Sequence, residues 1–157
     1  DPGIRTAFAG FAARRFGWVV DPVRVRTTAD VMMGVVEILR ATTEPGDGVV
    51  IMPPVYPPFA ICTAEAGCVT VPVPLRDTGS AWEMDLVGIE AALEAGARAV
   101  LLCNPHNPTG TAHSADALAA LAEIAERHGA VVISDEIHAP LVAEGVNYAP
   151  FLTAASP

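Results

Sequence analysis

Residues 98–110 read RAVLLCNPHNPTG, an apolar run that stops abruptly at a polar loop with two Asn-Pro steps. A continuous apolar run of this length predicts a strand that is buried on both faces. The pattern returns at residues 130–138, where AVVIS leads into SDEIH. Because ligands of parallel sheets bind beyond the carboxyl ends of the strands, these two loops are the first candidates for a functional site.

The rest of the chain alternates between helical and strand-like hydrophobic periods. The predicted helices cover residues 4–17, 32–39, 86–96 and 114–129, and the further strands cover residues 48–52 and 68–74. Pro72 indicates that the last of these strands lies at a sheet edge. The alternation predicts an α/β fold, with a parallel or mixed sheet in three layers and helices on both faces. No internal boundary is visible, so residues 1–157 are interpreted as one domain.

The composition is typical of a folded protein with neither a nucleic-acid nor a membrane partner. Of the 157 residues, 52% are hydrophobic and 17% are charged, and the formal net charge is −9. The nine basic residues are all arginines and are scattered, whereas a nucleic-acid binder normally concentrates positive charge in a patch. No apolar run approaches the ~20 residues that a membrane-spanning helix needs.

The cysteines and the loop histidines lack the spacing of metal ligands. Cys62, Cys68 and Cys103 show no CxxC pairing and stand among apolar residues, which indicates core thiols of a cytoplasmic protein. His106 and His113 are interpreted as loop residues. No metal site is predicted.

The acidic pair Asp135 and Glu136 at the end of a strand fits two unrelated chemistries. In a nucleotide-driven motor, such carboxylates hold magnesium, but the motor also needs a Gly-rich loop that ends in lysine. This sequence contains no lysine. The other chemistry is that of an enzyme that binds a pyridine ring through an aspartate. Taken alone, Asp135 also suits a cap of the following turn.

NPHNPTG at residues 104–110 resembles the asparagine loop of the fold-type I, pyridoxal-phosphate-dependent enzymes of the aminotransferase class I/II superfamily. The resemblance implies that the chain is part of the large domain of the PLP-dependent transferase fold. It also implies that Asn107 hydrogen-bonds the phenolic oxygen of pyridoxal 5'-phosphate. PPVYPPF at residues 53–59 resembles the segment whose tyrosine stacks on the pyridine ring, here Tyr56. Without the other motifs, Tyr56 would be interpreted as a turn residue.

A third string, SDEIH at residues 134–138, resembles the strand end that carries the pyridine-binding aspartate of the superfamily. The resemblance implies that Asp135 keeps the ring nitrogen protonated. His138 stands where transaminases of the superfamily usually have a tyrosine that contacts the phenolic oxygen. Glu136 is expected to support the loop and is assigned no catalytic role.

TADVMMGVV at residues 28–36 corresponds to the helix start whose backbone amides bind the cofactor phosphate in the superfamily. The resemblance assigns the amide donors to Val31 and Met32. Asp30 departs from the pattern, since many members have glycine there. Its carboxylate would repel a phosphate unless the side chain turns away or caps the helix.

The combination of these motifs, preceded by EPGDGVVI, looks most like the cystathionine β-lyase or cysteine C–S lyase subgroup of the MalY/PatB type. The subgroup cleaves the C–S bond of cystathionine or cysteine S-conjugates by β-elimination, which yields pyruvate, ammonia and a thiol. Two alternatives stay open at this point. One is an aminotransferase of the same superfamily, and the other is a non-catalytic, aminotransferase-like module of a transcription regulator.

The resemblance also implies parts that this sequence does not contain. The Schiff-base lysine is expected a few tens of residues after Asp135, and because the chain has no lysine we assign no catalytic residue within it. The N-terminal segment and the C-terminal small domain of the superfamily are likewise not recognised. We therefore expect an internal fragment that is inactive alone, from a cytoplasmic homodimer that acts on a small amino-acid substrate.

Overall fold

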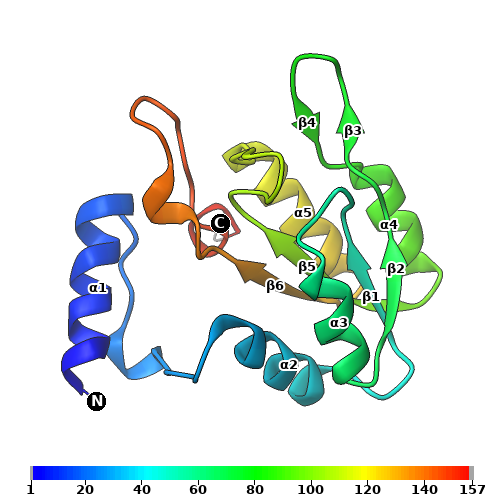
Figure 1. Ribbon diagram of the computed structural model, residues 1–157, viewed down its shortest axis with the longest axis horizontal. Coiled ribbons are helices and arrows are strands. Elements are labelled where there is room, and N and C mark those ends of the chain that lie inside the picture. Colours follow the sequence, from blue (N-terminus) through cyan, green and yellow to red (C-terminus); the bar gives the residue numbers. More distant parts are fainter. Residues whose placement is uncertain (1, 156–157) are drawn as a thin grey trace.

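The computed structural model describes residues 2–155, in which one four-stranded parallel sheet forms the centre. The strands follow the order β2-β1-β5-β6, and they comprise β1 (Gly48–Ile51), β2 (Val69–Pro72), β5 (Ala97–Cys103) and β6 (Val131–Asp135). All three pairings are parallel, and Pro72 lies on an edge strand, as predicted. An antiparallel hairpin of β3 (Arg76–Asp77) and β4 (Trp82–Glu83) stands apart from this sheet and was not predicted (Figure 1).

The four predicted helices are present, and the structure adds two short α-helices, α3 (Pro58–Glu65) and α6 (Phe151–Ala154), and two 3-10 helices, η1 (Pro22–Arg24) and η2 (Ala139–Leu141). The predicted helices are α1 (Pro2–Phe16), α2 (Val31–Thr42), α4 (Leu86–Glu94) and α5 (Ala115–Arg127). Ser114 caps α5 through a hydrogen bond from the Ala117 N–H, as predicted. Helix α3 was missed because its first turn lies in a proline-rich stretch, although proline suits the start of a helix.

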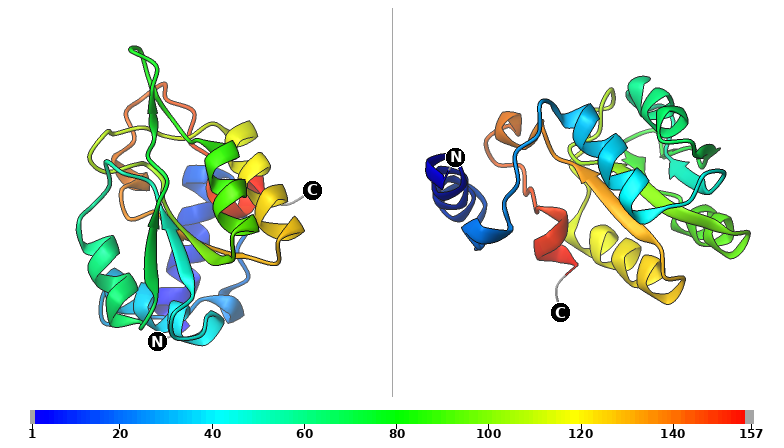
Figure 2. Two further views of the ribbon diagram at one scale, coloured as in Figure 1. Left: turned by 90° about the vertical axis from the view of Figure 1, so that its right-hand side faces the viewer. Right: turned by 90° about the horizontal axis from the view of Figure 1, so that it is seen from below.

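Two hydrophobic cores lie on opposite faces of the sheet, because successive side chains of a strand point to opposite sides. On one face, Val100 and Leu102 of β5 pack with buried residues of α4, α5 and α6, namely Ile89, Leu93, Leu118, Leu121, Ile124 and Phe151. On the other face, Leu101 packs with residues of α2 and α3, namely Val35, Val36, Leu39, Phe59 and Cys62. The right-hand view of Figure 2 shows the sheet between these helices. The predicted three-layer α/β fold is confirmed.

The strand order places a crevice at the carboxyl edge of the sheet. From β1 the chain passes through α3 to β2 at one edge, and it later returns to β5 and continues through α5 to β6 on the other side. The order therefore reverses between β1 and β5. The loops that leave these two strands diverge at such a point, which is where ligands of open α/β sheets bind.

Helix α1 lies to one side of the sheet (Figure 1). It contacts the segment that follows β6, since the Phe16 and Tyr148 rings meet edge to face with their centroids 5.1 Å apart. Between residues 2 and 155, none of the helices has both the length and the apolar character that are needed to cross a bilayer.

Candidate active site

A cavity of about 360 Å³ opens at the carboxyl edge of the sheet. Its volume lies within the range of roughly 300–1,000 Å³ that small-molecule sites occupy. The lining residues come from the start of α2, the loop after β1, the end of β5 with its loop, and the end of β6 with its loop, and they are Asp30, Val31, Met32, Tyr56, Cys103, Asn107, Asp135, Ile137 and His138. All six residues predicted for the cofactor site therefore share one cavity.

Asp135 is the last residue of β6, and only 7% of its surface is exposed. Its Oδ1 accepts a hydrogen bond from the Ile137 N–H at 3.1 Å, so the side chain does cap the following turn. This bond fixes the orientation of a carboxylate that also lines the cavity. A buried carboxylate is well suited to hold a proton on a ring nitrogen through a charge-assisted hydrogen bond.

Asn107 is held by Cys103, a contact that the sequence analysis did not foresee. The Asn107 N–H donates to the Cys103 Sγ at 3.3 Å, and the thiol donates to the Pro105 carbonyl at 3.4 Å. Burial raises the pKa of the Cys103 thiol to about 11, so the thiol keeps the proton that it donates. Cys103, predicted as a core thiol, is a free and buried cysteine that also touches the cavity.

Asn104 anchors the same loop at the end of β5 and was also not singled out by the sequence analysis. It is fully buried, and its N–H donates to the Asp135 carbonyl at 2.9 Å, which extends the pairing of β5 with β6. Its Nδ2 donates to the Ala149 carbonyl at 3.1 Å, and its Oδ1 accepts from the His113 N–H at 3.2 Å. Through its backbone and its side-chain amide, this one residue thus connects three segments.

Tyr56 lies in the loop between β1 and α3, and 37% of its surface is exposed. Its ring meets Phe59 edge-on, with centroids 6.2 Å apart and an interplanar angle of 81°. Phe59 is fully buried in the core and therefore supports the tyrosine from one side. An exposed aromatic face is suited to stacking against a flat conjugated ring.

At the start of α2, the side chain of Asp30 caps the helix, as one of the two expected ways to accommodate it requires. The Asp30 Oδ1 accepts from the Met33 N–H at 2.8 Å, which makes Asp30 the N-cap of the helix. The Gly34 N–H bonds the Asp30 carbonyl at 3.1 Å, so the amides of Val31 and Met32 are those at the open end of the helix. An open helix N-terminus favours anions.

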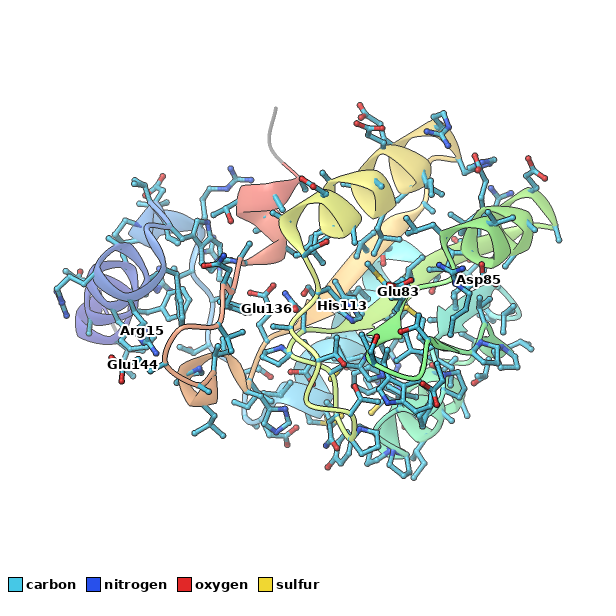
Figure 3. All side chains as sticks on the ribbon, turned by 90° about the horizontal axis from the view of Figure 1, so that it is seen from above. Arg15, Glu83, Asp85, His113, Glu136 and Glu144 are labelled. Atoms are coloured by element: carbon cyan, nitrogen blue, oxygen red, sulfur yellow. The ribbon has the colours of Figure 1, made fainter. Side chains whose placement is uncertain are left out.

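His138 and Glu136 follow Asp135 but differ in their roles. His138 lines the cavity and also a neighbouring one of about 410 Å³, which Asn107 shares. The Glu136 Oε1 accepts from the Ser134 Oγ at 2.9 Å and from the Phe151 N–H at 2.7 Å, so it supports the connection from β6 to α6. Figure 3 shows Glu136 and His113 near the middle of the molecule.

His106 and His113 belong to the loop after β5, as predicted, but they are not surface residues. Their side chains are buried, with 1% and 4% of their surfaces exposed. Burial lowers the pKa of both imidazoles, and that of His113 falls to about 4. The sequence offered no signal for this burial, because a polar loop with prolines is normally exposed.

The comparison with known families decides the assignment. The family model of aminotransferase class I and II matches residues 2–156. The chain belongs to this family. The cystathionine beta-lyase PatB of Bacillus subtilis is 36% identical over 152 residues, which cover 96% of this chain and 39% of the relative.

Solved structures agree with the fold. The PLP-bound C-S lyase of Staphylococcus hominis, in complex with L-cycloserine, superposes with a TM-score of 0.91 at 27% identity over 95% of this chain and 38% of its own. N-succinyldiaminopimelate aminotransferase of Mycobacterium tuberculosis gives a TM-score of 0.88 at 34% identity over 96% and 40%. The family member described here thus spans about two fifths of the length of these relatives.

Proposed function

We propose that this chain forms part of the cofactor site of a pyridoxal-5'-phosphate-dependent enzyme that cleaves the C–S bond of cystathionine or of cysteine S-conjugates. The observation that carries the proposal is the single cavity that gathers residues from four separate segments, from Val31 in α2 to His138 after β6. The family match and the PLP-bound relative support the same cofactor.

The donor set of the cavity fits the three polar parts of the cofactor. A protonated ring nitrogen donates a hydrogen bond and requires an anionic acceptor, which the Asp135 carboxylate supplies. An ionised phenolic oxygen requires a donor, and the Asn107 amide and the His138 ring are both available at the cavity wall. A dianionic phosphate suits the open amides at the start of α2. The apolar body of the ring suits the face of Tyr56.

These residues bind and orient, and the reactive chemistry is that of the cofactor. When bound, pyridoxal 5'-phosphate draws into its ring the electron pair that loss of a proton leaves on the amino-acid Cα. The task of Asp135 is to hold the proton at the ring nitrogen, which keeps the ring able to accept this charge. Asn107 fixes the phenolic edge, and Tyr56 restrains the tilt of the ring.

The distinction between lyase and aminotransferase depends on steps that these residues do not control. The identity to the cystathionine beta-lyase PatB supports β-elimination. The similarity to an aminotransferase of Mycobacterium tuberculosis keeps transamination as the second candidate. The predicted homodimer and the small amino-acid substrate belong to the whole protein and remain part of the proposal.

The test uses the longest protein that the gene encodes. The purified protein is incubated with pyridoxal 5'-phosphate and cystathionine, and pyruvate, ammonia and free thiol are measured together with any amino-group transfer to a keto acid. We expect the three elimination products in equal amounts. Amino transfer without pyruvate would replace the lyase by an aminotransferase, and failure to bind the cofactor would reject both.

A further inference from the structure

The imidazole of His106 joins two loops that are distant in sequence. Its Nε2 lies 3.0 Å from the Pro54 carbonyl oxygen, 52 positions earlier in the chain. Pro54 belongs to the loop after β1 that presents Tyr56, and His106 directly precedes Asn107. The hydrogen bond therefore connects the loop that carries the predicted stacking ring with the loop that carries the predicted amide donor.

The backbone of His106 is fixed independently of its ring. Its N–H donates to the Thr111 carbonyl at 2.7 Å, and its carbonyl accepts from the Gly110 N–H at 2.7 Å. These two bonds close the loop on itself around the second Asn-Pro step. Because the next residue, Asn107, is in turn held by Cys103, the loop is rigid on both sides of the imidazole.

The ring acts as a neutral donor. A carbonyl oxygen can only accept a hydrogen bond, so the hydrogen must lie on Nε2 of His106. Burial lowers the pKa of His106, and His113 packs edge to face against it with ring centroids 5.6 Å apart. Within residues 2–155, the buried Nδ1 of His106 has no hydrogen-bond partner, so no acceptor there favours a second proton on the ring.

We propose that His106 is a positioning residue that sets the spacing between Asn107 and Tyr56 across the cavity. The cofactor part of this inference rests on the proposed function, whereas the link between the loops does not. An apolar side chain of similar size would fill the same space but would leave the Pro54 carbonyl without this donor. The two loops would then lose the side-chain hydrogen bond that joins them.

The experiment compares three variants of the longest protein that the gene encodes. His106→Leu removes the donor, and His106→Gln keeps an N–H group at a similar reach. Leu121→Ala, a change at a fully buried position of α5 that belongs to neither loop, is the control for general loss of stability. Hydrogen–deuterium exchange of the apo protein is measured for residues 52–59 and 104–113, the Kd for pyridoxal 5'-phosphate is measured by equilibrium dialysis, and the Tm of each variant is recorded.

We expect His106→Leu to speed exchange in both loops of the apo protein and to weaken cofactor binding by about fivefold, the effect of one lost hydrogen bond. His106→Gln restores most of both properties. Leu121→Ala lowers the Tm, but it neither speeds hydrogen exchange selectively in the two loops nor changes the Kd.

Two results would overturn the inference. Faster exchange in His106→Leu that is confined to residues 104–113 would show that the loops are not coupled. An equal loss of affinity for pyridoxal 5'-phosphate in Leu121→Ala would show that His106 contributes only to general stability. If the wild-type protein bound no cofactor while both loops responded in the apo state, the proposed function would fail and the positioning role with it, but the link between the loops would stand.

Discussion

Asp135 serves two neighbours with one carboxylate. Its Oδ1 accepts from the Ile137 N–H, and the group also faces the cavity that Tyr56 and Asn107 line. An asparagine keeps an Oδ1 that can accept the same backbone bond, but it carries no negative charge. The structural and the proposed chemical roles of this residue can therefore be separated by a single substitution.

We predict that Asp135→Asn lowers kcat by about a hundredfold or more, because the proton at the ring nitrogen is no longer held by a negative charge. The Tm is expected to stay close to that of the wild type. The control is Glu136→Gln, whose Oε1 still accepts from Ser134 and Phe151, and which should leave turnover near the wild-type value. Steady-state kinetics and thermal unfolding measure the kcat and the Tm of the two variants. Turnover at the wild-type rate in Asp135→Asn would contradict the proposed role of Asp135 at the ring nitrogen.

His113 makes stability depend on pH. Its pKa falls from 6.5 to about 4 in the folded state, because the ring is buried and lies next to His106. The unfolded chain therefore binds a proton below pH 6.5 that the folded chain refuses until about pH 4. The free energy of unfolding should fall as the pH is lowered through this window, by at most ~1.4 kcal/mol per pH unit for this group.

The measurement is urea unfolding at several pH values between 4 and 7.5 for the wild type and for His113→Gln. The variant is expected to be less stable at neutral pH, but with a flatter dependence on pH. Curves that run parallel for the two proteins would show that His113 titrates normally in the folded state.

At the scale of single elements, the start of α2 combines a cap with the proposed phosphate site. Asp30 supplies the cap through its bond from the Met33 N–H, while its charge opposes any phosphate that binds near Val31 and Met32. The helix end thus balances two requirements. Glycine would remove the charge but also the cap, whereas asparagine would remove only the charge.

We predict that Asp30→Asn keeps the stability of the protein and tightens the binding of pyridoxal 5'-phosphate by about threefold to tenfold, the effect of removing one nearby like charge in a partly exposed site. Asp30→Ala, the comparison variant, should instead cost about 1 kcal/mol of stability through loss of the cap. Chemical unfolding and equilibrium dialysis provide the two readouts. Weaker binding by Asp30→Asn would place the phosphate elsewhere.

Strand β5 supports both faces of the sheet. Leu101 and Leu102 are fully buried and point into different cores, whereas Arg98 at the start of the strand is exposed.

We predict that Leu101→Ala and Leu102→Ala each lower the free energy of unfolding by about 2–5 kcal/mol, through lost burial and the cavity left behind. Arg98→Ala should change it by less than about 0.5 kcal/mol. A small effect at either leucine would mean that one face of the sheet is loosely packed.

At the scale of the whole molecule, the described residues that line the proposed site gather at one edge of the sheet. The cavity opens at the carboxyl edge of the sheet, and the chain spans 39% of the length of PatB. The sequence contains no lysine, so the covalent anchor of the cofactor in this superfamily has no counterpart among its 157 residues.

We predict that the 157-residue chain expressed alone produces no pyruvate from cystathionine, whereas the longest protein that the gene encodes does. The reason is that the residues of this chain orient a cofactor but include no amine base for the Cα proton. A coupled lactate dehydrogenase assay on both proteins checks this, with free pyridoxal 5'-phosphate as the blank. Pyruvate formation by the 157-residue chain above that blank would contradict it.

The local pattern of the sequence determined the elements and the motifs. The apolar runs predicted the parallel strands β5 and β6, Pro72 predicted the edge, and Ser114 predicted a helix start, because each signal depends on neighbours within one turn or one strand. The expected burial on both faces holds for β5 but is wrong for β6, which ends the sheet and leaves Val131 and Val132 half-buried. The resemblance of four short strings to one family then named the candidate residues of the site. The hairpin β3-β4 lacked such a signal, since its strands have only two residues each.

Only the tertiary structure decided which of these residues meet. It brought six predicted residues from four segments to one cavity, turned the Asp30 carboxylate back onto its own helix, and buried His106 against a carbonyl 52 positions away. Burial of a polar loop residue depends on what packs over it from elsewhere in the chain, and hydrophobic periodicity contains no information about such distant partners.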